Sequence, residues 1–287
     1  MNIFQAIKMQ CSLMFHKYSF KFVFSLMMIY SLGVYLINLY TSSGKDVSTL
    51  HSAVSLYVGS SIGEYFHYFS SIFPFIVVFP FAFSYLNDKS VNIIPFVMTR
   101  MGSNYYYSSK LIAAFIGGVL IILIPFAINL LLLTITFPHN DNTYFGFFHD
   151  INYGSRLLGT NVIVSSAGKG LPFLQLYMTS PLLHSCLYLV FLSLFSGLLS
   201  IFALACSYWI SKYKVLVFIP VYLLFFMCNT LDNFLFKSQN YLNTILLDYV
   251  TVDVSPGKHA LFFIPFCFVI LFFSLYRSWQ VSLKDQI

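Results

Sequence analysis

Long apolar stretches separated by short polar segments dominate the pattern of this 287-residue chain. Six such stretches are long enough to cross the hydrocarbon core of a bilayer as α-helices, which takes roughly 20 residues. A transmembrane β-barrel would instead have alternating segments of about ten residues, which the sequence lacks. The pattern predicts an all-α integral membrane protein whose six transmembrane helices lie at residues 20–40, 66–86, 111–137, 181–210, 215–236 and 259–276.

The segment ahead of the first span, residues 1–19, has apolar side chains at helical spacing on one face and polar ones such as Lys8 and His16 away from it. We expect this amphipathic helix to lie along the membrane interface before the chain turns into the first span. An early start of the first transmembrane helix is the alternative. The apolar face consists of Ile3, Phe4, Ile7, Cys11, Met14, Phe15 and Tyr18.

Composition excludes a water-soluble globule. Only 8% of the residues are charged, 59% are hydrophobic and the mean hydropathy is +0.80. Soluble domains carry roughly 25% charged residues, which they need to cover their surface. We therefore interpret residues 1–287 as a single transmembrane domain.

The distribution of Lys and Arg predicts the orientation of the chain. With the N-terminus inside, the inner segments hold ten of these residues and the outer segments hold five. The positive-inside rule then places both termini and residues 87–110 in the cytoplasm, and residues 138–180 in a long extracellular loop. The positive charges are dispersed along the inner loops, so we expect no nucleic-acid partner.

Chemical motifs are missing from the sequence. The predicted spans are almost free of the buried charges that ion-coupled transporters use, and His67 and His184 lie near their outer ends. The sequence contains no zinc-protease motif, no nucleophile-elbow motif and no phosphate-binding loop. We therefore expect a chain that is not an enzyme and that has no catalytic residues and no cofactor of its own.

The long outer loop contains four residues that are capable of binding a metal, namely His139, Asp141, His149 and Asp150. Their spacing matches no helical pair of ligands, and short polar residues are common in solvated loops. We expect no metal site there. The length of the loop favours local helices or a packed cap.

The inner segment 87–110 is longer than a simple connection between two spans requires. It mixes polar residues with apolar ones, Pro95 interrupts its helical pattern, and Gly102 is placed to end a helix after Arg100. The pattern predicts a short amphipathic element at the cytoplasmic interface, and a solvated, lipid-anchored loop is the alternative. The residues that this element would offer to a cytosolic partner are Asp88, Lys89, Thr99, Arg100 and Ser103.

The predicted topology and this inner segment resemble those of the permease subunits of bacterial ABC-2 type transporters. In that family the segment often has an acidic residue, a run leading to Thr-Arg, and a tyrosine-containing stretch that ends in Lys. Asp88, Thr99, Arg100, residues 105–107 and Lys110 fit this pattern. Relatives most often have Glu at the acidic position, where this chain has Asp88.

The resemblance implies a permease of the bacterial plasma membrane that is powered by a dimer of separate cytosolic ABC ATPases, which bind ATP and magnesium. The inner segment would act as the coupling helix, through Asp88, Lys89, Thr99, Arg100, Ser103 and Lys110. A second permease chain, identical or related, would complete the pathway. Short re-entrant helices at residues 241–250 are also implied.

The many phenylalanines favour export of a hydrophobic or amphipathic substrate, such as a peptide or a lipid-like molecule. A different class of function stays open at this point. The chain is alternatively a membrane sensor or assembly protein that transports nothing and binds a cytosolic partner through residues 87–110.

Overall fold

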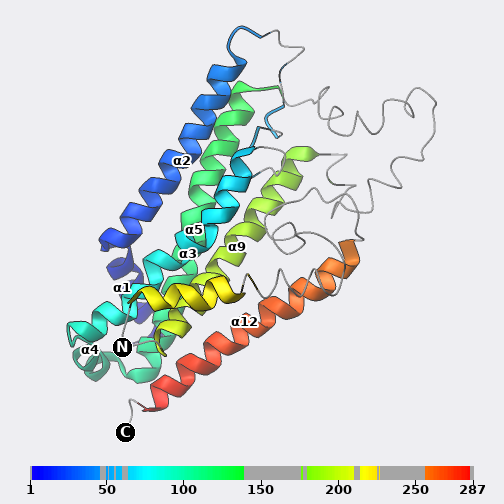
Figure 1. Cartoon of the computed structure of the whole chain (residues 1–287). Coiled ribbons are helices and arrows are strands. Elements are labelled where there is room, and N and C mark those ends of the chain that lie inside the picture. The colour runs from blue at the N-terminus through cyan, green and yellow to red at the C-terminus, as the bar shows by residue number, and fades with distance from the viewer. Residues whose placement is uncertain are drawn as a thin grey trace.

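The computed structural model of the chain describes residues 2–45, 50, 52–54, 56–59, 64–138, 176, 180–209, 214–224, 226 and 256–284. Within these residues every regular element is a helix. The longest helices run along one another in a bundle, and α12 lies on its flank against α9 (Figure 1). They are α2 (Tyr18–Ser42), α3 (Glu64–Ser90), α5 (Ser103–Thr136), α9 (Pro181–Ser207) and α12 (Pro256–Lys284).

Among the residues that the structure describes, four helices are long and apolar enough to cross a membrane, namely α2, α5, α9 and the Pro265–Leu283 part of α12. This supports a helical membrane protein, as the apolar pattern predicts. The second predicted span corresponds to α3, which contains Pro74 and Pro80. Within the described residues the structure thus supports the first, third, fourth and sixth predicted spans, and the total of six stays a prediction.

The fifth predicted span is the one that differs most from the prediction. Of residues 215–236 the structure describes 215–224 and 226. They begin in a 3₁₀ turn, Lys214–Val217, and continue as a short helix that crosses the bundle obliquely instead of running along it (Figure 1). Two segments lie outside the described residues, namely residues 139–150, where we expect no metal site, and the implied re-entrant segment at residues 241–250.

The helices on either side of the inner segment are longer than their apolar stretches. α3 continues to Ser90 and α5 begins at Ser103, so the connection between them reduces to α4 (Ile94–Met101) and its flanking residues. Pro95 lies in the first turn of α4, where its missing N–H group costs no hydrogen bond. The interruption predicted at Pro95 thus lies just before it, between Ser90 and Ile94, and Pro95 itself belongs to the start of the next helix. Gly102, with a φ of +81°, ends α4 as predicted.

A separate helix, α1 (Ile3–His16), precedes the bundle and meets α2 at a break. The break is at Lys17, whose extended backbone ends α1 and starts α2. The alternative of one continuous first span is therefore excluded. α1 turns Ala6, Gln10 and Met14 toward the protein.

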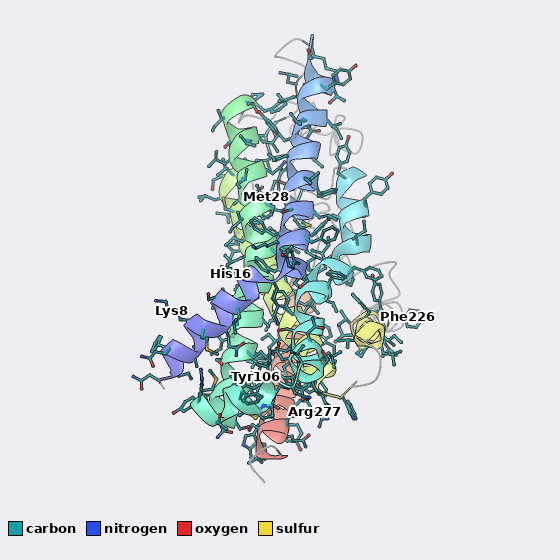
Figure 2. All side chains as sticks on the ribbon, turned by 90° about the vertical axis from the view of Figure 1, so that its left-hand side faces the viewer. Lys8, His16, Met28, Tyr106, Phe226 and Arg277 are labelled. Carbon is teal, nitrogen blue, oxygen red and sulfur yellow. The ribbon has the colours of Figure 1, made fainter. Side chains whose placement is uncertain are left out.

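α1 also keeps apolar side chains on its outside. Phe4 is 81% exposed, and Lys8 and His16 point away from the bundle (Figure 2). The predicted apolar face is thus divided between the protein and the surroundings. An exposed Phe4 fits a helix that contacts lipid headgroups. The interfacial location itself stays a prediction.

The start of α1, helix α4 and the end of α12 all lie at one end of the bundle (Figure 1). The far end of α2, at Ser42, lies at the opposite end. The structure thereby brings together the segments that the charge distribution assigns to one side of the membrane. That this side is the cytoplasm is a prediction from the positive-inside rule.

Close packing of α5 on α9 holds the centre of the bundle. A Cβ atom on Gly118 would lie 2.1 Å from Ser200 Oγ and 3.0 Å from the Cα atom of Gly197. Ser196 Oγ donates a hydrogen bond of 2.8 Å to the Gly118 carbonyl. Small residues at a helix interface allow this approach, which replaces the hydrophobic driving force that helices lack in lipid.

Labelling of introduced cysteines tests the orientation. In a cysteine-free chain, Ser43→Cys should react with a membrane-impermeant maleimide in intact cells, because Ser43 is exposed at the far end of α2. Arg100→Cys, exposed on α4, should react only after the membrane is opened. Labelling of Arg100→Cys in intact cells would contradict the predicted orientation.

Substitution of a helical glycine tests the α5–α9 contact. Gly118→Ala should destabilise the protein by about 2 kcal/mol, because the added methyl group overpacks the interface. Gly33→Ala on α2 is the matched control, since a Cβ atom there meets nothing within 4 Å. Thermal unfolding in detergent measures both, and equal midpoints for the two variants would refute the packing argument.

Candidate functional site

Asp88 lies at the centre of a charged cluster at the α4 end of the bundle. It is in the last turn of α3, where the partial negative charge of the helix terminus disfavours a carboxylate. Two ammonium groups offset this: Lys110 Nζ contacts Asp88 Oδ2, and Lys17 Nζ lies 3.3 Å from Asp88 Oδ1. The Tyr106 hydroxyl also donates to Asp88 Oδ2, at 3.1 Å.

Each of these side chains is positioned by the helix that carries it. Tyr106 and Lys110 are one turn apart on α5 and therefore share a face, and Lys110 Nζ donates a hydrogen bond of 2.9 Å to Tyr106 Oη. Ser84 and Asp88 are one turn apart on α3. Lys17, at the break between α1 and α2, reaches both of them, and its Nζ is 2.8 Å from Ser84 Oγ.

Because its side chain is buried, Lys110 needs Asp88 as a counter-ion. Its side chain is 3% exposed, whereas those of Asp88 and Lys17 are 22% and 28% exposed. A buried ammonium group without a counter-ion costs several kcal/mol. Two tyrosine rings add to its stabilisation, since Lys110 Nζ lies 5.0 Å from the ring centre of Tyr106 and 5.9 Å from that of Tyr85.

Four buried tyrosines surround the ion pair between Asp88 and Lys110 and join three helices. Tyr85 of α3, Tyr107 of α5 and Tyr208 at the end of α9 contact one another through their rings, with 4.7 Å between the ring centres of Tyr85 and Tyr208. Tyr106 packs edge to face on Tyr107. Figure 2 shows Tyr106 near the same end of the bundle as Arg277 of α12. The cluster therefore lies where α3, α5 and α9 come together.

A cavity of about 220 Å³ opens beside the cluster, between α1, α3, α4 and α5. One wall is polar and is formed by the cluster residues together with Gln10. The other wall is apolar. The polar wall consists of Gln10, Lys17, Ser84, Asp88, Tyr106 and Lys110, and the apolar wall of Leu13, Met14, Phe81, Ile93, Val97, Ala113, Ala114 and Leu204.

The six predicted coupling residues fall into two groups. Asp88 and Lys110 meet inside the bundle, and the buried Ser103 donates a hydrogen bond of 3.0 Å to the Ser282 carbonyl of α12. The expectation that Ser103 is offered to the cytosol is therefore wrong. The other three, Lys89, Thr99 and Arg100, are exposed.

Sequence reasoning missed Lys17, Ser84 and Tyr208 as members of the cluster. One signal was available, because Asp88 and Asp285 are the two acidic residues among ten basic ones on the predicted inner segments. An isolated carboxylate in such a setting is expected to have a basic partner. Which lysine it pairs with depends on how the helices pack, and no local pattern contains this information.

The described residues contain no group of three or more potential metal ligands. The cysteines among them, Cys11, Cys186, Cys206 and Cys267, are free thiols. Burial raises the pKa of the Cys11 thiol on α1, which disfavours the reactive thiolate.

Compared with protein-family models, with curated proteins and with solved structures, the chain matches none of them. The resemblance to ABC-2 permeases therefore depends only on the predicted topology and on the residues of the inner segment.

Charge substitutions test the role of Asp88. Asp88→Asn should destabilise the protein by about 3 kcal/mol, because it leaves Lys110 buried without a counter-ion. Lys110→Met should cost less, since Asp88 keeps Lys17 as a partner. The double variant Asp88→Asn/Lys110→Met should recover part of the loss.

The control is Lys89→Gln, because Lys89 is one residue away and exposed. Thermal unfolding in detergent is the measurement. If Asp88→Asn unfolded at the same temperature as the control, the pairing would not be structural.

Proposed function

We propose that the chain is the transmembrane permease subunit of an ATP-driven exporter, with α4 as the helix that receives force from a separate cytosolic ABC ATPase dimer. The observation that carries this proposal is the geometry of α4. It is a short two-faced helix at the end of the bundle, and it connects directly to α3 and α5.

The two faces of α4 support a partner contact. Val97 and Met98 are partly buried and pack against the core of the bundle. On the other side Phe96 is 73% exposed, and Thr99 and Arg100 are exposed as well. A helix that is anchored on one side and offers an aromatic ring and a guanidinium group on the other is suited to binding a protein groove.

The connections of α4 support transmission of force. Asn92 and Gly102, both with positive φ, flank the helix, and the ion pair between Asp88 and Lys110 ties α3 to α5 beside it. A push on α4 therefore acts on two bundle helices that are joined as a unit. Rigid elements of this kind carry motion between a binding surface and a pathway.

In this proposal the energy comes from ATP and magnesium in the partner ATPase, because the sequence has no phosphate-binding loop of its own. A second permease chain, identical or related, completes the pathway in the bacterial plasma membrane. The cargo is hydrophobic or amphipathic, a peptide or a lipid-like molecule, in line with the 34 phenylalanines of the chain. A non-transporting membrane sensor would present the same face of α4, so the experiment must separate the two functions.

The test is purification of the tagged chain in mild detergent, followed by measurement of ATP hydrolysis in the retained complex. We expect a stoichiometric ATPase without membrane spans. Arg100→Glu should lower the amount of retained ATPase about tenfold, because charge reversal at an interface typically costs more than 1.4 kcal/mol. Lys21→Glu, an exposed charge reversal on α2, should leave it unchanged.

Asp88 is left intact in this test, since its loss would disturb the buried pair and not only the surface. Retention of a partner that hydrolyses no nucleotide would favour the sensor function. Equal ATPase retention by Arg100→Glu and by the wild type would exclude α4 as the contact through Arg100.

A further inference from the structure

We infer that the cavity between α1, α3, α4 and α5 binds the phosphodiester group of a membrane phospholipid. This inference does not rest on the proposed function, because it concerns a site within this chain that a permease or a sensor would equally possess. Four kinds of observation lead to it: the charge balance of the cluster, the polar groups around the cavity, its apolar wall and its place in the fold.

The charge balance leaves one positive charge unpaired. Lys17 and Lys110 share a single carboxylate, that of Asp88, and no other ion pair joins either lysine to a described residue. All three side chains line the cavity. The excess positive charge attracts an anionic ligand. A ligand with one negative charge, as a phosphodiester carries, would neutralise the cluster.

The polar wall is rich in hydrogen-bond donors. Two ammonium groups, the hydroxyls of Ser84 and Tyr106 and the amide of Gln10 line it. Gln10 is only 6% exposed and lines the cavity. Its amide is a further polar group that a ligand in the cavity would meet. Phosphate oxygens accept hydrogen bonds from the two ammonium groups, the Ser84 hydroxyl and the Gln10 amide, and the bonds from ammonium groups are the strongest. The single proton of the Tyr106 hydroxyl is already donated to Asp88.

The apolar wall distinguishes a lipid from a soluble phosphate. Leu13, Met14 and Phe81 are among the eight apolar residues that line the same cavity as the polar groups. A free phosphate ion would gain nothing from them and would lose its hydration. The glycerol backbone and first methylene groups of a lipid would instead cover them, at about 25 cal/mol for each Å² buried.

The place of the cavity in the fold points the same way. It lies at the bundle end where α1 breaks from α2, and two large side chains near this break are exposed. Tyr18, directly after Lys17, is 90% exposed, and Leu13 on α1 is 51% exposed. Amphipathic helices with such residues lie at the level of lipid headgroups. A phospholipid of the surrounding leaflet would therefore meet the cavity at the height of its phosphate.

Thermal unfolding of the full chain in mild non-ionic detergent tests the inference with three probes. They are phosphatidylglycerol, diacylglycerol with the same acyl chains, and inorganic phosphate. We expect phosphatidylglycerol to raise the unfolding midpoint in a saturable way. Diacylglycerol lacks the phosphodiester group and inorganic phosphate lacks the apolar part, so each should have a clearly smaller effect.

Lys17→Gln is the decisive variant. It removes the excess charge but keeps the pair between Asp88 and Lys110, so the protein should still fold. The apparent affinity for phosphatidylglycerol should fall about tenfold, the usual loss for a charged hydrogen bond. Lys21→Gln is the matched control, because Lys21 is one turn away on α2, exposed and not part of the cavity wall. Gln10→Leu, which removes only the amide, serves as a second variant if Lys17→Gln does not fold, and it should also weaken binding.

Three results would overturn the inference. One is equal stabilisation by phosphatidylglycerol and diacylglycerol, which would mean that only the apolar part binds. Another is an affinity of the folded Lys17→Gln or Gln10→Leu variant equal to that of Lys21→Gln. The third is tight binding of inorganic phosphate alone, which would assign the site to a soluble anion.

Discussion

The ammonium group of Lys110 is buried, and the arrangement of the α4 end of the bundle depends on its carboxylate partner. Lys110 belongs to α5, whereas Asp88 belongs to α3, so their pairing joins the two helices that flank α4. Lys17 extends the connection to the junction of α1 and α2. A buried charge tolerates little displacement, because the loss of its partner costs several kcal/mol. The cluster therefore fixes the relative positions of four helices through a few polar atoms.

Residues 87–110, which the sequence pattern treats as one element, fall into two groups in the structure. Asp88, Ser103 and Lys110 form bonds within the chain. Thr99 and Arg100 are exposed. An exposed surface can change partners without affecting the fold, whereas the inner residues cannot. This division keeps α4 firmly attached to the bundle while its outer side chains stay exposed.

Elsewhere the bundle is held by close packing and by hydrogen bonds between helices. Ser31 of α2 donates a bond of 2.6 Å to the Pro125 carbonyl of α5, and Asn129 returns one of 2.9 Å to the Ser31 carbonyl. At the α5–α9 interface Gly118 lets the two backbones approach. Such contacts matter most in lipid, where burial of apolar surface gives helices little reason to associate. The charged cluster differs from these contacts in its ion pairs and lies at one end of the bundle.

The sequence by itself determined the helical membrane class, the approximate positions of the long helices and the end of α4 at Gly102. These are local properties, since hydrophobic length and the φ preference of glycine do not depend on distant residues. The tertiary structure decided which polar and charged side chains pair with one another. Lys17 and Asp88 are 71 positions apart, and Ser103 and Ser282 are 179 apart. Which of their side chains meet depends on how the helices rotate and slide against one another, and that follows from packing of the whole bundle and not from any pattern along the chain.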